Sequence, residues 1–305
     1  MQIRSLPISR AWDWFLQAVN LGVRNPRAVF GGALLLVATL YMLMLAGGLL
    51  GSLLGGGGGQ PGTAALALML LTVVAVFLLV PVLVGGLMHV IRESEAGRPV
   101  HARDLFAPFR QGRAGKLAAF GSLQMGAMLL GGLVTSQLAG SEYMAAYSEA
   151  VNAILQQQQP APLPAPAHGL LLFVWQVAFN YFTTTVVLLG IALVALSGSG
   201  VAQAIGAAAR ASLRNIAPNL LAAALFLGAV LIAGLMLSVV GSVVLLVLGK
   251  VFMPLALLVG LVLTFAFITA VLVVVCGGGY LIWRDTFAHG DVATEASAAP
   301  HQIEV

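Results

Sequence analysis

Residues 81–113 read PVLVGGLMHVIRESEAGRPVHARDLFAPFRQGR, and within this stretch the chain changes from apolar to strongly charged. The first part is apolar through Ile91 and carries the Gly85-Gly86 pair. From Arg92 onward the stretch is basic, with acidic and aromatic residues in between. An apolar run followed by a short basic segment is typical of a transmembrane helix that ends at the cytoplasmic face. The stretch therefore predicts both a membrane fold and an orientation.

The composition of the whole chain points the same way. Of its 305 residues, 60% are hydrophobic and only 8% are charged, and the mean hydropathy is +1.01. A soluble domain carries roughly a quarter charged residues, so lipid must be the solvent for most of this surface. We predict an all-α polytopic membrane helix bundle. Its six transmembrane helices are expected at about 28–54, 64–91, 117–139, 169–196, 219–248 and 251–283.

Short flanking segments complete the expected domain organisation. Residues 1–27 are expected to be cytoplasmic and amphipathic, residues 28–284 to form the transmembrane domain, and residues 285–305 to form a disordered cytoplasmic tail. Within the first segment, Trp12, Phe15 and Val19 recur at helical spacing. Two interpretations stay open: a helix in the membrane interface with Trp12 and Trp14 at headgroup depth, or a helix packed on the bundle.

Basic residues are gathered on one side of the expected spans. Every Lys and Arg except Lys250 precedes the first span, follows the second, precedes the fifth or closes the sixth. Because short loops rich in Lys and Arg stay cytoplasmic, both termini are expected inside, and the net charge of +4 should face anionic lipid headgroups. Nucleic acid is not an expected partner, since the loops contain no recognition module.

Aromatic and basic residues at the span ends are the expected contacts with the lipid interface. They are Trp12, Arg92, Arg103, Phe106, Phe109, Arg110, Tyr280, Trp283 and Arg284. In the loop after the second span, Asp104 is expected to cap a short helix whose Leu105, Phe106 and Phe109 point one way. On the outer side, Met144 to Leu155 is expected to form another short helix before a Pro-rich connector.

The fourth span has the most polar face. Gln176, Asn180 and Thr184 lie one helical turn apart, and they either bond a neighbouring helix or line the path of a solute. Small residues in other spans form ridges that allow close helix packing and a homo-oligomer. These ridges are Gly47-Gly51-Gly55, Gly48-Ser52-Gly56 and Ala127-Gly131-Thr135-Ala139.

No catalytic residue, metal ligand or cofactor is predicted. Glu93, His101 and Asp104 lie in one loop, but their spacing matches neither a zinc-protease motif nor a calcium loop, and arginines lie between them. An enzyme that uses these three residues on lipid headgroups is the least favoured hypothesis. The one cysteine, Cys276, lies inside an apolar run.

The two ends of the transmembrane domain repeat each other at one constant separation. Pro26 corresponds to Pro218, Gly85-Gly86 to Gly277-Gly278, and Arg92-Glu93 to Arg284-Asp285. Each unit has an amphipathic stretch, two spans and an exit with an Arg and an acid. Both first spans leave the cytoplasm, so we expect a parallel internal repeat. Chance matching in a glycine-rich chain is the alternative.

Short motifs in these same regions resemble a family of uncharacterised multi-pass bacterial inner-membrane proteins. They are Pro81, Gly85-Gly86, Gly97, Val100, Asp104-Leu105-Phe106, Phe109, Asn215, Pro218, Tyr280, Arg284-Asp285 and Phe287. The chain is more distantly similar to the membrane domain attached to some glycerophosphodiester phosphodiesterases. The resemblance implies a six-span protein of a bacterial inner membrane, and no reaction.

Two functions remain in view. The first is a non-enzymatic protein that organises lipid or partner proteins, because basic and amphipathic segments recur beside the spans. The second is a permease for a neutral or lipidic solute. The centres of the spans carry no Asp, Glu, Lys or Arg, and intramembrane charges are usual in ion-coupled transport.

Overall fold

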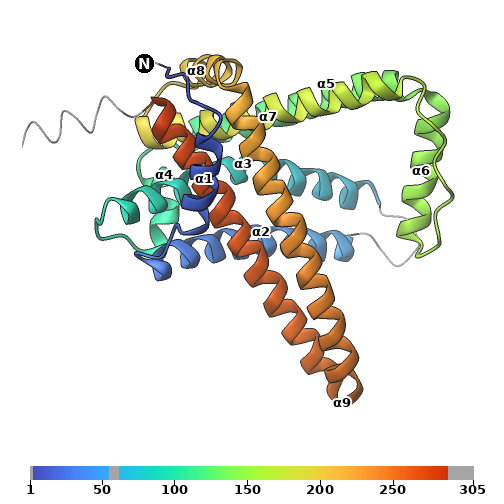
Figure 1. Ribbon diagram of the computed structural model, residues 1–305. Coiled ribbons are helices and arrows are strands. Elements are labelled where there is room, and N and C mark those ends of the chain that lie inside the picture. The colour runs from blue at the N-terminus through green and yellow to red at the C-terminus, as the bar shows by residue number, and fades with distance from the viewer. Residues whose placement is uncertain (1–2, 55–61, 288–305) are drawn as a thin grey trace, which may run out of the picture.

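The computed structural model describes residues 3–54 and 62–287 (Figure 1). Within these ranges the chain forms helices joined by turns, with no strand. The last helix continues to Phe287, slightly beyond the expected start of the tail at residue 285. The rest of the predicted disordered tail and part of the first glycine ridges lie outside the described residues.

Five of the described helices are long and apolar enough to cross a membrane. They are α2 (Pro26–Leu54), α3 (Thr63–Glu95), α5 (Ala114–Ala139), α7 (Gly169–Ser197) and α9 (Ile216–Phe287). Shorter elements connect or precede them: α1 (Arg10–Val19), η1 (Ala102–Phe106), α4 (Ala107–Arg110), α6 (Ser141–Leu155) and α8 (Val201–Arg214). An all-helical multi-pass membrane protein is thus confirmed, and α6 confirms the short helix predicted at Met144 to Leu155.

The longest helix, α9, is interrupted at Phe252, where the backbone is extended with φ −157° and ψ 94°. Pro254 follows closely, and a proline cannot donate the backbone hydrogen bond that would continue a helix. Figure 1 shows the two arms of α9 running side by side in opposite directions. The reversal lies just after residues 249–250, which separate the expected fifth and sixth spans.

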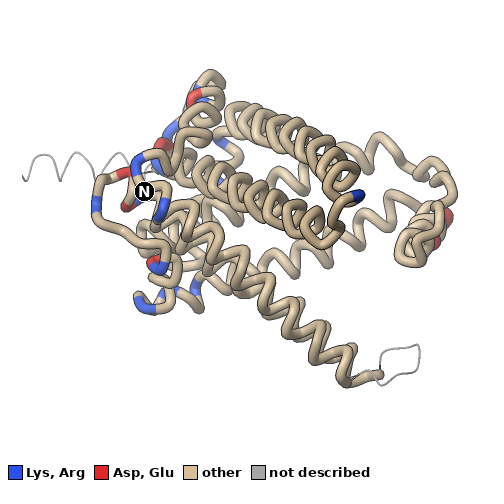
Figure 2. Tube along the Cα trace, turned by 90° about the horizontal axis from the view of Figure 1, so that it is seen from below, with Lys and Arg blue, Asp and Glu red and all other residues tan. Residues whose placement is uncertain are grey.

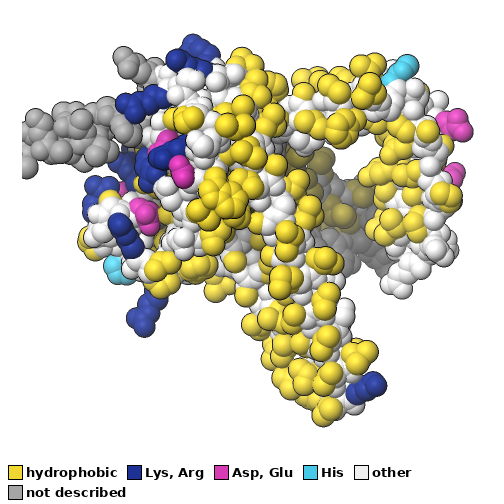
Figure 3. All heavy atoms as spheres, in the orientation of Figure 1, with side chains coloured by type: hydrophobic (Ala, Val, Ile, Leu, Met, Phe, Trp, Pro, Cys, Tyr) yellow, Lys and Arg dark blue, Asp and Glu magenta, His cyan; other side chains and the backbone are white. Residues whose placement is uncertain are grey.

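Three helical hairpins diverge from a shared base in Figure 1. They are α2 with α3, α5 with α7, and the two arms of α9. Figure 2 shows most of the blue Lys and Arg gathered at one end of the molecule. The surfaces of the hairpins are mostly hydrophobic in Figure 3. We call the end of the molecule that contains α1, η1, α4 and α8 the charged base.

A short segment precedes each hairpin. The second and third segments each pack on the preceding hairpin, and the first packs on the last hairpin. The η1 segment packs on α2 and α3, and α8 packs on α7. The first segment, α1, packs on α9, the last hairpin. The segments therefore form a closed ring that connects the three hairpins at the charged base.

The hydrophobic core lies where the hairpins meet at this base. Its largest fully buried side chains include Trp14, Leu87, Phe120 and Leu193. Glycine makes the closest approach possible: a Cβ at Gly86 would overlap the backbone carbonyl of Leu105. Gly86 thus lets η1 lie directly on the end of α3, while Gly85 faces Ala195 and Leu117 instead.

Candidate functional site

The carboxylate of Asp285 is the most heavily bonded side chain of the charged base. One oxygen accepts hydrogen bonds from Arg10 Nε at 2.7 Å and from Trp14 Nε1 at 2.8 Å. The other oxygen accepts from Arg284 Nε at 3.1 Å. The Asp285 side chain is only 7% exposed. A buried carboxylate with two arginines and an indole N–H is a compensated charge, and it holds α1 against the end of α9.

The contact with Asp285 decides how α1 is oriented. Ala11, Trp14 and Ala18 are fully buried against the bundle, whereas Trp12 is 52% exposed. Arg284 also reaches α1, because its Nη2 donates to Gln17 Oε1 at 3.0 Å. The structure shows α1 packed on α9 with Trp12 on its outward face, and a position of Trp12 at headgroup depth stays a prediction.

Asn215 joins the N-terminal segment to the start of the last hairpin. Its side-chain oxygen accepts from the backbone N–H of Leu6 at 2.9 Å, and its Nδ2 donates to the carbonyl of Arg4 at 2.9 Å. The Arg4 backbone N–H donates to the carbonyl of Thr286. The buried Asn215 amide thus bonds the backbone of residues 4–6 through both its donor and its acceptor, and holds this segment close to Asp285.

Two arginines from different hairpins cap the end of α7. Arg92 Nη1 donates to the carbonyl of Leu196 at 2.9 Å, and Arg113 Nη1 donates to the carbonyl of Ala195. Carbonyls in the last turn of a helix have no partner inside it and carry partial negative charge, which cations stabilise. Gly198, with φ +68°, then turns the chain toward α8.

Asp104 stabilises the loop between the first and second hairpins. It accepts from the backbone N–H of His101 at 2.9 Å and from Arg110 at 2.7 Å. These bonds, the backbone one foremost, hold the pKa of Asp104 below its usual value. Asp104 was predicted as the capping residue itself, but the N-cap of η1 is His101, and Asp104 is the third residue of that helix and bonds back to the cap. The three apolar residues do not share a face, since Leu105 is buried and Phe109 is 47% exposed.

The residues predicted to contact the lipid interface separate into two groups. Exposed or half-buried on the surface of the charged base are Trp12, Arg103, Phe106, Phe109 and Arg110. Bonded within the base or buried in it are Arg92, Arg284, Tyr280 and Trp283. Only the first group offers a substantial surface to a headgroup.

The polar stripe on α7 is divided between two environments. Gln176 Nε2 donates to Thr135 Oγ1 on α5 at 2.8 Å, and Asn180 Nδ2 donates to the Gln176 carbonyl at 2.8 Å. Thr184 instead lines a cavity of about 220 Å³ between α7 and α9, beside Asn219. The structure therefore brings Gln176 and Asn180 together and places Thr184 apart from them.

Of the three residues weighed for catalysis, His101 and Asp104 lie together, and the acids each pair with an arginine. Glu93 pairs with Arg98, Asp104 pairs with Arg110, and His101 Nδ1 lies 4.0 Å from Asp104 Oδ2. Over residues 3–54 and 62–287, no group of three His, Cys, Asp or Glu side chains could hold a metal ion.

Sequence reasoning did not identify the Asp285 cluster as a docking site. The sequence contained a signal, because an acid that follows an arginine at the end of an apolar helix needs a partner. It could not show that the partners come from α1. Comparison with known proteins supplies no further guide: no family model, no curated protein and no solved structure matches this chain.

Proposed function

We propose that this chain is a non-enzymatic membrane protein that gathers anionic lipid around its charged base. The observation that carries the proposal is the excess of cations there that pair with no acid of the described residues. The acids of the base are mostly bonded inside it: Asp13, Glu93, Asp104 and Asp285 each pair with an arginine. No acid of the described chain pairs with the cations Arg27, Arg103, Lys116, Arg210 and Arg214.

Such cations beside apolar hairpins favour a membrane with negative surface charge. Each Arg or Lys near an anionic surface contributes about 1 kcal/mol. By the same charge rule we place the base in the cytoplasm of a bacterial cell, the protein in the inner membrane, and both termini inside. Two fusions test the orientation. A fluorescent protein fused after residue 287 should fluoresce, because that end is inside, and alkaline phosphatase fused after residue 158 should be active, because that loop is outside.

The proposed span count is six, with each arm of α9 crossing once. A span needs roughly 20 residues, and each arm of α9 on either side of Phe252 is longer than that. The proposed parallel repeat is supported by the helix bounds. At the separation that pairs Pro26 with Pro218, α1 corresponds to α8, and the last residue of α3, Glu95, corresponds to the last residue of α9, Phe287.

The lipid shell of the protein tests the proposal. The full chain is extracted with its lipids into polymer-bounded discs, and the ratio of phosphatidylglycerol to zwitterionic lipid is compared with that of the parent membrane. We expect enrichment of phosphatidylglycerol that falls by at least half in the triple variant R103Q/R210Q/R214Q. K250Q, at the opposite end, is the matched control and should leave the ratio unchanged. A shell with the parent composition around the wild type contradicts the proposal.

A permease is the second candidate, because one small cavity has a polar wall. The cavity of about 220 Å³ between α7 and α9 is lined by Thr184, Thr185 and Asn219, and Asn219 Oδ1 is buried without a hydrogen-bond partner in the described chain. A small neutral solute could satisfy that oxygen. Stopped-flow swelling of proteoliposomes with glycerol or urea tests this: flux should exceed that of protein-free vesicles and fall in N219L. Equal flux removes the permease.

A further inference from the structure

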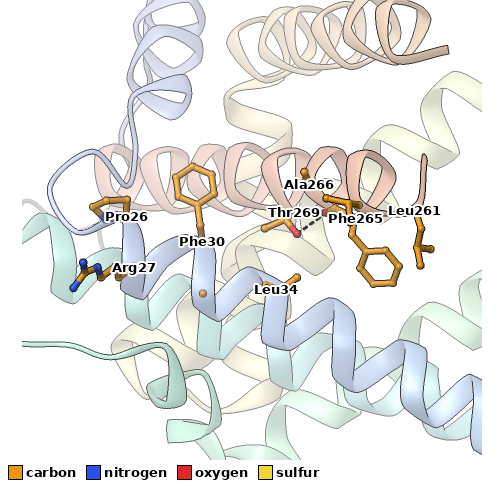
Figure 4. A pocket seen from close by; sticks show the side chains of 10 residues that line it. Pro26, Arg27, Phe30, Leu34, Leu261, Phe265, Ala266 and Thr269 are labelled. Carbon is orange, nitrogen blue, oxygen red and sulfur yellow. Dashed lines mark hydrogen bonds between the residues drawn. The ribbon is translucent and has the colours of Figure 1, made fainter. Parts of the chain in front are cut away.

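A lateral cleft separates the first hairpin from the last. It has a volume of about 990 Å³ and lies between α2 and the second arm of α9 (Figure 4). Phe30 and Leu34 line one wall, and Leu261 and Phe265 line the other. The hydroxyl of Thr269, also in the wall, donates to the Phe265 carbonyl at 2.7 Å, so it does not make the cleft polar.

The cleft has one polar end. Arg27 lies at the end nearest the charged base, as Figure 4 shows. It is exposed, and no acid of the described chain pairs with it. Beyond Leu34, Tyr41 of α2 meets Phe265 edge to face, with ring centroids 5.4 Å apart, and this contact ties the two walls together.

The cleft extends over about two thirds of the hydrocarbon of one leaflet. From Arg27 to Leu34, α2 rises about 10 Å, and half of the hydrocarbon core is about 15 Å thick. A ligand in the cleft would therefore have a charged group at headgroup depth and an apolar part that reaches toward the midplane. Because Arg27 is cationic, the charged group should be an anion.

We propose that this cleft binds one phospholipid with an anionic headgroup, taken from the leaflet around the charged base. The phosphate contacts Arg27, and an acyl chain lies between Phe30, Leu34, Leu261 and Phe265. The proposal rests on the proposed function, since it assumes that the base faces anionic lipid. It adds one defined lipid-binding site to the shell of anionic lipid proposed around the charged base.

Native mass spectrometry of the full chain in detergent tests the site. The protein is titrated with phosphatidylglycerol or phosphatidylcholine that carry the same acyl chains. The first bound lipid should favour phosphatidylglycerol about fivefold in Kd, the effect of about 1 kcal/mol from one Arg. R27Q should reduce the preference to less than twofold. L34W and A266W, two separate ways to fill the cleft, should remove the tight first site for both lipids.

The matched control is R103Q, an exposed arginine outside the cleft. It should leave the first site unchanged while it weakens later anionic lipids. Equal binding of both lipids to the wild type, a preference that survives R27Q, or a tight first site that survives both tryptophan variants overturns the proposed site. A dimer that appears in place of lipid does the same. If the discs show no enrichment of phosphatidylglycerol while mass spectrometry still shows the tight first site, only the proposed function is contradicted.

Discussion

Replacing Asp285 with Asn should release α1 from the bundle. The amide retains the shape of the carboxylate but loses its charge, and its NH₂ group must face Arg10, Trp14 or Arg284, all of which are donors. Hydrogen bonds to a charged group contribute about 1.5–3 kcal/mol each. We take the lower end for Arg10, because its side chain is 35% exposed. The free energy that holds α1 in its docked position should fall by about 3 kcal/mol in total. At 1.4 kcal/mol per decade, the population with α1 undocked should rise about 100-fold.

Cysteine labelling measures this population directly. Cys276 is replaced by Ser, and Ala18, which is fully buried on the docked face of α1, is replaced by Cys. When docking is faster than labelling, the rate of reaction with a water-soluble maleimide follows the undocked population. We expect the rate to rise about 100-fold in D285N.

Two controls separate this pairing from a general loss of stability. D13N removes only the outer ion pair of Arg10, at 3.2 Å and with the Asp13 side chain 49% exposed, so the rate should change less than threefold. R10Q and D285N should be less than additive in a double-mutant cycle, because they remove the same interaction. Additive effects, or a D13N effect as large as that of D285N, would refute the assigned role of Asp285.

Three further perturbations test other parts of the charged base. G86A should lower the free energy of unfolding in mixed micelles by about 1–3 kcal/mol, because the new methyl group would overlap the Leu105 carbonyl; G126A on α5, where a Cβ meets no neighbour, should cost nothing, and equal losses would contradict the packing. R92Q should cost about 1 kcal/mol in the same measurement by uncapping α7, with R103Q as the neutral comparison; an unchanged stability would show that the Leu196 contact contributes nothing. The pKa of Asp104 is lowered by its bonds to His101 and Arg110, so its stabilisation of the loop is complete above the unfolded value of about 3.9 and is lost as pH falls through the lower folded pKa. Pepsin cleavage at Leu105-Phe106 should therefore increase between pH 4 and 2 in the wild type, relative to cleavage in D104N. A constant ratio of the two cleavage rates would count against this role.

The membrane helices could be predicted from the sequence because lipid leaves the backbone few choices. A long apolar segment must satisfy its own hydrogen bonds, so it becomes a helix wherever about 20 apolar residues follow one another. The predicted limits of the second span, about 64–91, fall within α3 (Thr63–Glu95) for this reason. The reversal in α9 was placed within a few residues for a different reason, namely the interruption of the apolar run at Gly249 and the charged Lys250, between the expected fifth and sixth spans.

The arrangement of the charged base could not be predicted, because its partners are far apart in the chain. Asp285 meets Arg10 and Trp14, and no local pattern relates residues at such a distance. Helical spacing did mark α1 as amphipathic. It could not distinguish a lipid surface from the end of α9, since both are apolar beside a polar rim. The same limit applied to Arg92, where a flanking cation can equally contact a headgroup or a helix end.

The ring of short segments also has a consequence for the order in which the protein is made. Every segment except α1 emerges from the ribosome after the hairpin on which it packs. The partner of α1 is α9, whose carboxylate at Asp285 is synthesised last of all these groups. Until then Ala11, Trp14 and Ala18 have no protein surface to cover them. Burial of α1 therefore requires synthesis to pass Asp285, and a nascent chain or one truncated before it exposes the apolar face of α1 to proteases and chaperones.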